Sequence, residues 1–245
     1  MSHIHIPDGV LPIWLVVIGW IATAVILYLC IRRVRNVQLG RKIPLIGIVS
    51  AIMIVGMTLE IIPIAYHINM SVIAGIVLGP ALGFVSVFIV DLMIAMFGHG
   101  GFTVVGLNTL VVGTEAVLGF YFFHAFLGLL SSSKISTGLS AALATMLSLI
   151  ISTSLMIGIV YVSQVNTEKI LHVDKESFIG QVFSLGPHRE NEQHEMQDNK
   201  IDIETFAKTV FFLGMFGWIL EAVISGFVIR YVSRVRPDLI LSEAT

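Results

Sequence analysis

The sequence predicts an all-α fold: a polytopic membrane helix bundle that forms a single transmembrane domain over residues 1–245. Hydrophobic residues make up 56% of the chain and charged residues only 12%, whereas soluble proteins carry about 25% charged residues. The apolar residues also occur in runs long enough to cross a bilayer, which takes about 20 residues of helix. A chain of this kind must bury much of its surface in lipid.

Composition also excludes several other classes of protein. A net charge of −2 provides no basic surface for nucleic acid. Cys30 is the only cysteine, which excludes an intrachain disulfide and a cysteine-based zinc site. The first apolar run follows His, Pro and Asp instead of a basic stretch, so we expect no cleavable signal peptide.

Five spans follow directly from the apolar runs 12–31, 43–62, 103–126, 137–162 and 207–229. A sixth apolar stretch, 68–97, would form one helix of roughly 45 Å, which is too long for a single span. The Gly79-Pro80 step in its middle should interrupt a helix at that point. We therefore expect two short helices within this stretch.

The distribution of basic residues supports the same division, because basic loops favour the cytoplasmic side. The first loop holds Arg32, Arg33, Arg35, Arg41 and Lys42. If the stretch 68–97 contributes two spans, Lys134, Arg230, Arg234 and Arg236 fall on the same side as that loop. The prediction is about seven transmembrane helices, with the N-terminus outside and the C-terminus cytoplasmic.

Residues 164–206 form the one long polar segment, with nine acidic residues against four basic ones. The predicted topology places this segment outside the membrane as an extracytoplasmic acidic loop. Its low hydrophobicity indicates partial disorder.

Histidine is the commonest metal ligand among side chains, and four histidines fall on the predicted outer side. His3 and His5 lie in the N-terminal segment 1–12, His67 ends the second loop, and His99 lies in the Gly98-His99-Gly100-Gly101 turn. Each one alone is more simply a surface histidine. Their common side favours a transition-metal site, with 1–12 as a metal-binding segment.

The chain end offers further nitrogen ligands. His3 is the third residue if Met1 is retained and the second if Met1 is removed, which the small Ser2 would allow. In either case the terminal amine, the intervening backbone nitrogens and the imidazole can surround one ion in a plane. Planar nitrogen sites favour Ni(II) or Cu(II).

Several acidic residues have structural and functional interpretations. Asp8, in the Pro7-Asp8-Gly9 turn, caps the first helix or orients a ligating imidazole, and we favour the capping role. Acids inside a bilayer are costly and often functional. For Asp91, Glu115 and Glu221 we expect hydrogen bonds to Asn108, to Ser and Thr hydroxyls or to arginines of a partner, with proton relay as the alternative.

Two sequence motifs resemble those of a known family. The run His5-Ile6-Pro7-Asp8-Gly9 is similar to the N-terminal motif of the CbiM/NikM family, the substrate-capture (S) components of energy-coupling-factor (ECF) importers for cobalt and nickel. The resemblance continues through His67, the Leu78-Gly79-Pro80 step, and the segments 97–103 and 106–108.

The resemblance implies a multi-pass protein of the cell membrane of a prokaryote. It also implies a seven-helix S component that holds the metal through N-terminal nitrogens, a nearby histidine and a histidine before the third helix. By motif the two histidines are His5 and His67. The family places the first histidine at the second residue, whereas His5 is the fifth. The implied ligands are therefore His3, His5 and His67, with or without Met1 or Ser2, while Asp8, His99 and Asn108 line or support the site.

The predicted function is capture of Ni(II) or Co(II) as transported substrate, without an organic cofactor, for cobalt or nickel supply such as cobalamin biosynthesis. The chain has no G-x-x-x-x-G-K-[ST] run, so it is not itself expected to hydrolyse ATP. Its expected partners are a transmembrane coupling (T) subunit, ABC ATPase subunits, a small accessory membrane subunit and membrane lipid.

Two alternatives remain open at this point. An ion-coupled secondary transporter or channel would use Asp91, Glu115 or Glu221. A haem oxidoreductase would need facing histidines inside the bilayer, but His124 is the only histidine well inside a predicted span.

Overall fold

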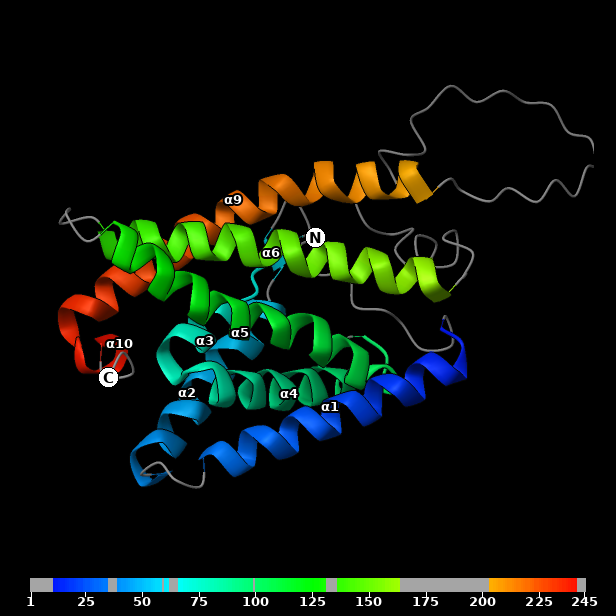
Figure 1. Ribbon diagram of the computed structural model, residues 1–245, viewed down its shortest axis with the longest axis horizontal. Helices are drawn as coiled ribbons and strands as arrows, with labels where there is room; N and C mark the ends of the chain where they lie inside the picture. Colours follow the sequence, from blue (N-terminus) through cyan, green and yellow to red (C-terminus); the bar gives the residue numbers. More distant parts are fainter. Residues whose placement is uncertain are drawn as a thin grey trace, which may run out of the picture.

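The chain folds into a bundle of α-helices, as the sequence predicts, and Figure 1 shows the helices lying roughly along one long axis. The computed structural model describes residues 11–34, 39–58, 60–61, 66–98, 100–130, 136–163 and 203–241. The helices are α1 (Ile13–Val34), α2 (Leu39–Thr58), α3 (Ser71–Leu78), α4 (Pro80–Met96), α5 (Val105–Leu129), α6 (Ser136–Ser163), α9 (Ile203–Val235) and α10 (Asp238–Leu241). The two-residue strands β1 (Glu60–Ile61) and β2 (Tyr66–His67) pair antiparallel between α2 and α3.

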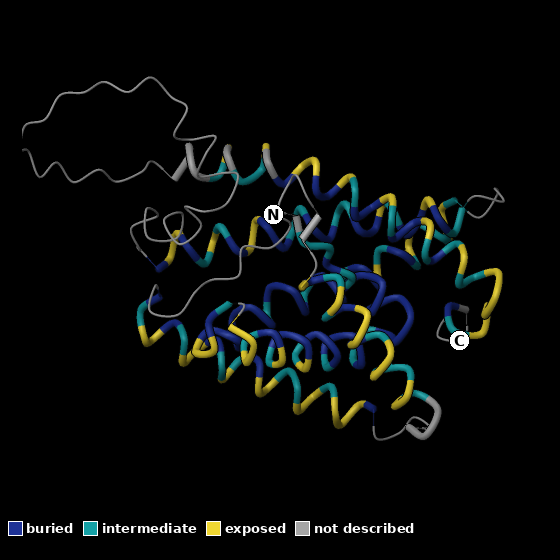
Figure 2. The backbone as a smooth tube through the Cα atoms, turned by 180° about the vertical axis from the view of Figure 1, so that it is seen from behind, coloured by how far each residue is buried: buried dark blue, intermediate teal, exposed yellow. Residues whose placement is uncertain are grey.

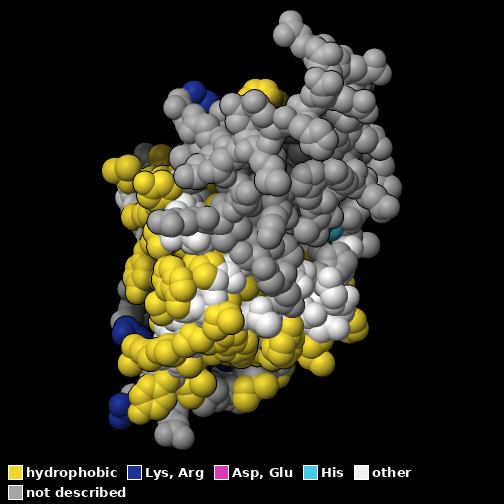
Figure 3. Space-filling view, turned by 90° about the vertical axis from the view of Figure 1, so that its right-hand side faces the viewer, with side chains coloured by type: hydrophobic (Ala, Val, Ile, Leu, Met, Phe, Trp, Pro, Cys, Tyr) yellow, Lys and Arg dark blue, Asp and Glu magenta, His cyan; other side chains and the backbone are white. Residues whose placement is uncertain are grey.

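Four of the described helices are long and apolar enough to cross a membrane, namely α1, α5, α6 and the Val210–Val235 part of α9. Two shorter apolar helices, Lys42–Thr58 and Pro80–Met96, accompany them. Large apolar side chains face outward on these helices, including Ile13 at 81% exposure. On the end of the molecule seen in Figure 3, the described side chains are mainly hydrophobic. This surface is that of a multi-pass membrane protein.

The predicted break at Gly79-Pro80 is confirmed. Gly79 adopts φ 85°, in the left-handed region that glycine tolerates, and Pro80 begins α4. With eight residues, α3 rises only about 12 Å, so it would cross a bilayer only together with the non-helical residues before it. The count of seven spans stays a prediction.

Helix α5 lies at the centre of the packing and contacts α1, α3, α4 and α6, while α6 also packs along α9. All eight residues of α3 are buried, and Figure 2 shows α3 and α4 in the buried interior, with the largely exposed α1 along one edge. Glycines permit the closest approaches. A Cβ added at Gly75 of α3 would lie 1.9 Å from the carbonyl oxygen of Ala116 on α5.

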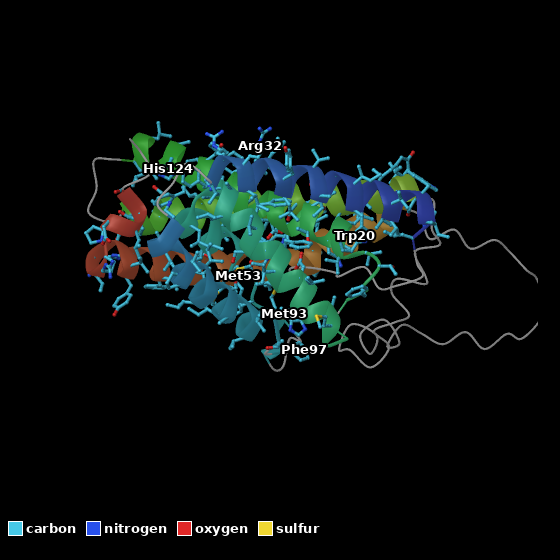
Figure 4. All side chains as sticks on the ribbon, turned by 90° about the horizontal axis from the view of Figure 1, so that it is seen from below. Trp20, Arg32, Met53, Met93, Phe97 and His124 are labelled. Carbon is cyan, nitrogen blue, oxygen red and sulfur yellow. The ribbon has the colours of Figure 1, made fainter. Side chains whose placement is uncertain are left out.

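The described basic residues gather mainly at one end of the bundle. In Figure 1, α1 ends, α2 begins, α6 begins and α9 ends at the same end, and these helix ends carry Arg32, Arg33, Lys42 and Arg234. Figure 4 shows Arg32 toward this end and Trp20 toward the other. This one-sided arrangement agrees with the charge pattern of the loops, while the orientation in the membrane stays a prediction.

The contact between α3 and α5 generates a stability prediction. Gly75→Ala should lower the melting temperature in detergent, because overpacking a tight contact costs about 1–3 kcal/mol. Gly158→Ala is the matched control, because a Cβ at this α6 glycine meets nothing within 4 Å. A melting temperature of Gly75→Ala equal to that of the wild type would contradict the close approach.

Candidate metal site

Two of the predicted metal-site residues lie in the described part of the chain. His67 is partly buried at the end of β2, and Asn108 is buried on α5 at 6% exposure. The other predicted residues, Met1, Ser2, His3, His5, Asp8 and His99, lie outside the described residues.

His67 is held by the backbone on both sides. Its Cα pairs with that of Glu60 across the β1–β2 hairpin. The next residue, Ile68, donates its N–H to the carbonyl oxygen of Gly56 on α2 at 3.2 Å. A Cβ at Gly56 would lie 2.9 Å from the carbonyl oxygen of Ile68, so the absence of a side chain allows this approach. The hairpin and α2 therefore fix the backbone at His67.

The residue after Ile68, Asn69, is 3% exposed and bonds to three different elements. Its backbone N–H donates to Oε1 of Glu221 on α9 at 2.8 Å, and its side-chain Nδ2 donates to Oε2 of Glu115 on α5 at 2.6 Å. Its Oδ1 accepts the backbone N–H of Ser71 at 2.9 Å. One asparagine thus joins α5 and α9 to the first turn of α3.

Glu115 is completely buried and accepts hydrogen bonds from both sides. Ser71 donates its hydroxyl to Oε2 at 2.7 Å, and Ser152 of α6 donates its hydroxyl to Oε1. The expectation that buried acids pair with hydroxyls is confirmed for Glu115. Asn108, the other expected partner, lies on the same face of α5, about two turns nearer the helix start.

These bonds show how deep the end of the second loop lies. The sequence assigns this loop to the outer side and predicts no depth for it. Asn69 contacts Glu115 and Glu221, which lie near the middle of their helices. The chain follows this path because Glu115, Ser152 and Glu221 supply buried polar partners there, which a surface loop would not need.

Asp91 on α4 has a different environment. It is 2% exposed and lies next to the Thr109 hydroxyl of α5, but not in hydrogen-bond geometry. Neither carboxyl oxygen has a hydrogen-bond partner within the described part of the chain. Asp91 therefore takes no described part in holding the His67 segment.

Helix α1 is fixed against the start of α5. Trp20 donates its indole N–H to the carbonyl oxygen of Thr103 at 2.7 Å, and Thr23 donates its hydroxyl to that of Gly106 at 2.6 Å. Leu11 packs in one apolar cluster with Val104 and Leu107. The end of the predicted metal-binding N-terminal segment, at Leu11, and the helix that follows it are thus anchored at the start of α5.

The backbone conformation explains the glycines in the turn before α5. Gly98 and Gly100 have φ values of 81° and 80°, which L side chains rarely adopt. These two glycines flank His99 in the sequence, so the turn motif that the sequence singled out is a backbone requirement.

The two histidine-bearing parts of the chain therefore attach to one helix. Leu11 belongs to the same apolar cluster as Leu107, and Asn69 bonds to Glu115. These α5 residues are eight positions apart (115 − 107), or about 12 Å along the axis.

The described residues alone provide only part of a metal site. Among them, no three His, Cys, Asp or Glu side chains lie close enough to hold one ion. Within this part of the chain His67 and His124 are the only histidines. His124 Nδ1 lies 2.9 Å from the carbonyl oxygen of Phe120 on its own helix, and Figure 4 shows His124 toward the basic end of the bundle.

Solved structures and a curated relative resemble this chain. Two crystal structures of transition metal transporters, one of them truncated, superpose with TM-scores of 0.63 and 0.66 at 20% and 19% identity. The first match covers 98% of this chain and 96% of the other, and the second covers 94% and 98%. At this identity they establish the shared fold.

A candidate metal transport protein of Haloquadratum walsbyi is 32% identical over 128 residues. That match spans 50% of this chain and 58% of the relative. The family described as the cobalt uptake substrate-specific transmembrane region matches residues 5–239, nearly the whole chain. The resemblance found in the motifs is confirmed, and the chain belongs to this CbiM family of membrane components for cobalt uptake.

Proposed function

We propose that this chain captures Ni(II) or Co(II) from outside the cell and delivers it for ATP-driven import, as the substrate-specific subunit of an ECF transporter. The observation that carries the proposal is the placement of His67. This histidine lies on a hairpin fixed to α2, and the segment after it is bonded to α5 and α9. A ligand whose backbone is already fixed is preorganised, so less conformational entropy is lost when the metal binds.

The anchoring of residue 11 supports a site shared with the N-terminal segment. From Leu11, the six residues to His5 span at most about 20 Å when extended. The axial distance on α5 between the two anchor points is about 12 Å. The length of the intervening chain is compatible with a shared site, and the proposed ligands are His3, His5 and His67, with or without the nitrogens of Met1 or Ser2.

Nitrogen donors suit both candidate metals. Imidazole binds nickel, copper, zinc and iron well, and selection in cells depends on geometry and metal supply as well as on affinity. A planar set of four nitrogens would favour nickel. Asp8, His99 and Asn108 are proposed to line or support this site.

Calorimetry on the purified chain tests metal capture. His67→Ala should abolish tight binding of Ni(II) and Co(II), and His5→Ala should weaken it strongly, because each change removes an imidazole ligand. His124→Ala is the matched control, since this histidine lies on α5 toward the basic end. Unchanged affinity for both metals in His67→Ala and His5→Ala would refute the proposed site.

Uptake into proteoliposomes tests the partners. We expect the chain to accumulate metal only with a T subunit, ABC ATPases and ATP, with or without a small accessory membrane subunit. His67→Ala in the same assembly should abolish uptake. Metal accumulation by the chain alone, driven by an ion gradient, would instead favour a secondary transporter that uses Asp91, Glu115 or Glu221.

A further inference from the structure

The chain between His67 and α3 is unusually well fixed for a connection between two helices. Asn69 and Ser71 are 3% and 0% exposed. Each of the two residues after His67 donates its backbone N–H to a different helix: Ile68 to Gly56 of α2 and Asn69 to Glu221 of α9. The position of His67 therefore depends on these contacts.

Glu115 and Glu221 supply the acceptors for this segment. Glu115 binds the Asn69 amide and the Ser71 hydroxyl through one oxygen, and Glu221 binds the Asn69 backbone. Ser152 holds the other oxygen of Glu115 from α6. Four helices, α3, α5, α6 and α9, thus contribute side chains to one buried polar cluster around Asn69.

Helix packing alone does not explain these two carboxyl groups. Apolar residues next to them on the same helices, Ala116 and Ala222, are buried as well, so burial at these positions does not itself require an acid. Burying an acid is unfavourable unless its oxygens are hydrogen-bonded. What these residues provide, and an apolar residue would not, is a set of hydrogen bonds to the segment after His67.

We infer that Glu115 and Glu221 are positioning residues for metal capture: by holding Asn69 they set the place and direction of His67. The inference rests on the proposed function, in which His67 is a ligand. They act by accepting hydrogen bonds and do not touch the ion. Groups that orient metal ligands typically change metal affinity about 10- to 100-fold when they are removed.

The test compares leucine and glutamine variants of the full chain in detergent. Glu115→Leu and Glu221→Leu remove the acceptors. Glu115→Gln and Glu221→Gln remove the charge but keep an amide oxygen for Asn69, and the amide nitrogen introduced by Glu115→Gln can donate to the Ser152 hydroxyl. Asp91→Leu is the matched control, since it removes another buried acid that has no described bond to the segment.

Two readouts separate positioning from general stability: calorimetric affinity for Ni(II) and the visible absorption of the bound ion at saturation. We expect the leucine variants to bind about 10- to 100-fold more weakly, with a changed nickel spectrum. The glutamine variants and Asp91→Leu should keep the affinity and spectrum of the wild type. If the leucine variants do not fold, Asn69→Ala removes the bond to Glu115 from the other side and should likewise weaken binding.

Several results would overturn the inference. An unchanged affinity in the leucine variants, or in Asn69→Ala, would remove the positioning role. Equal losses in the glutamine and leucine variants, or a similar loss in Asp91→Leu, would point to buried charge instead of hydrogen bonding. If the wild-type chain bound neither nickel nor cobalt, the proposed function itself would fail, which is a distinguishable outcome.

Discussion

The interior hydrogen bonds of Glu115 constrain the rest of this bundle. A polar group among apolar helices has no water to bond and must find its partners within the protein. Glu115 finds Ser152 on α6, and Ser71 and Asn69 at the entry to α3. These bonds draw the connection between α2 and α3 inward, toward the middle of α5. The path of this connection then decides where His67 lies.

Close contacts at glycines allow this arrangement. Gly75 lets α3 lie directly against α5, and Gly106 lets α1 approach the start of the same helix. Both histidine-bearing segments are therefore attached to α5. Because small residues permit backbones to approach in membrane helices, the glycines that look like simple packing residues also determine how far apart the two proposed halves of the metal site are anchored.

The sequence predicts the helices well because each depends on local properties. Apolar runs locate the spans, and the left-handed Gly79 followed by Pro80 ends one helix and begins the next. The depth of the His67 segment is a tertiary property, since it depends on Glu115 and Glu221, which are distant in the sequence. The apolar pattern does not identify Asn69 as a central residue, although an asparagine in an apolar stretch beside a candidate ligand is itself a signal.

The hydrogen bonds after His67 hold the backbone on one side of the proposed metal site, the side that carries this histidine. The residues that follow His67 are bonded to α2, α5 and α9, so the backbone at this histidine has little freedom to move toward an ion. In the proposed function, the N-terminal ligands must then adjust to His67 and not the reverse. A fixed His67 backbone reduces the conformational entropy that is lost when the metal binds. Selection between metals then depends on the coordination geometry that the N-terminal ligands can complete. The acids that hold Asn69 would thereby influence selectivity without contacting the metal.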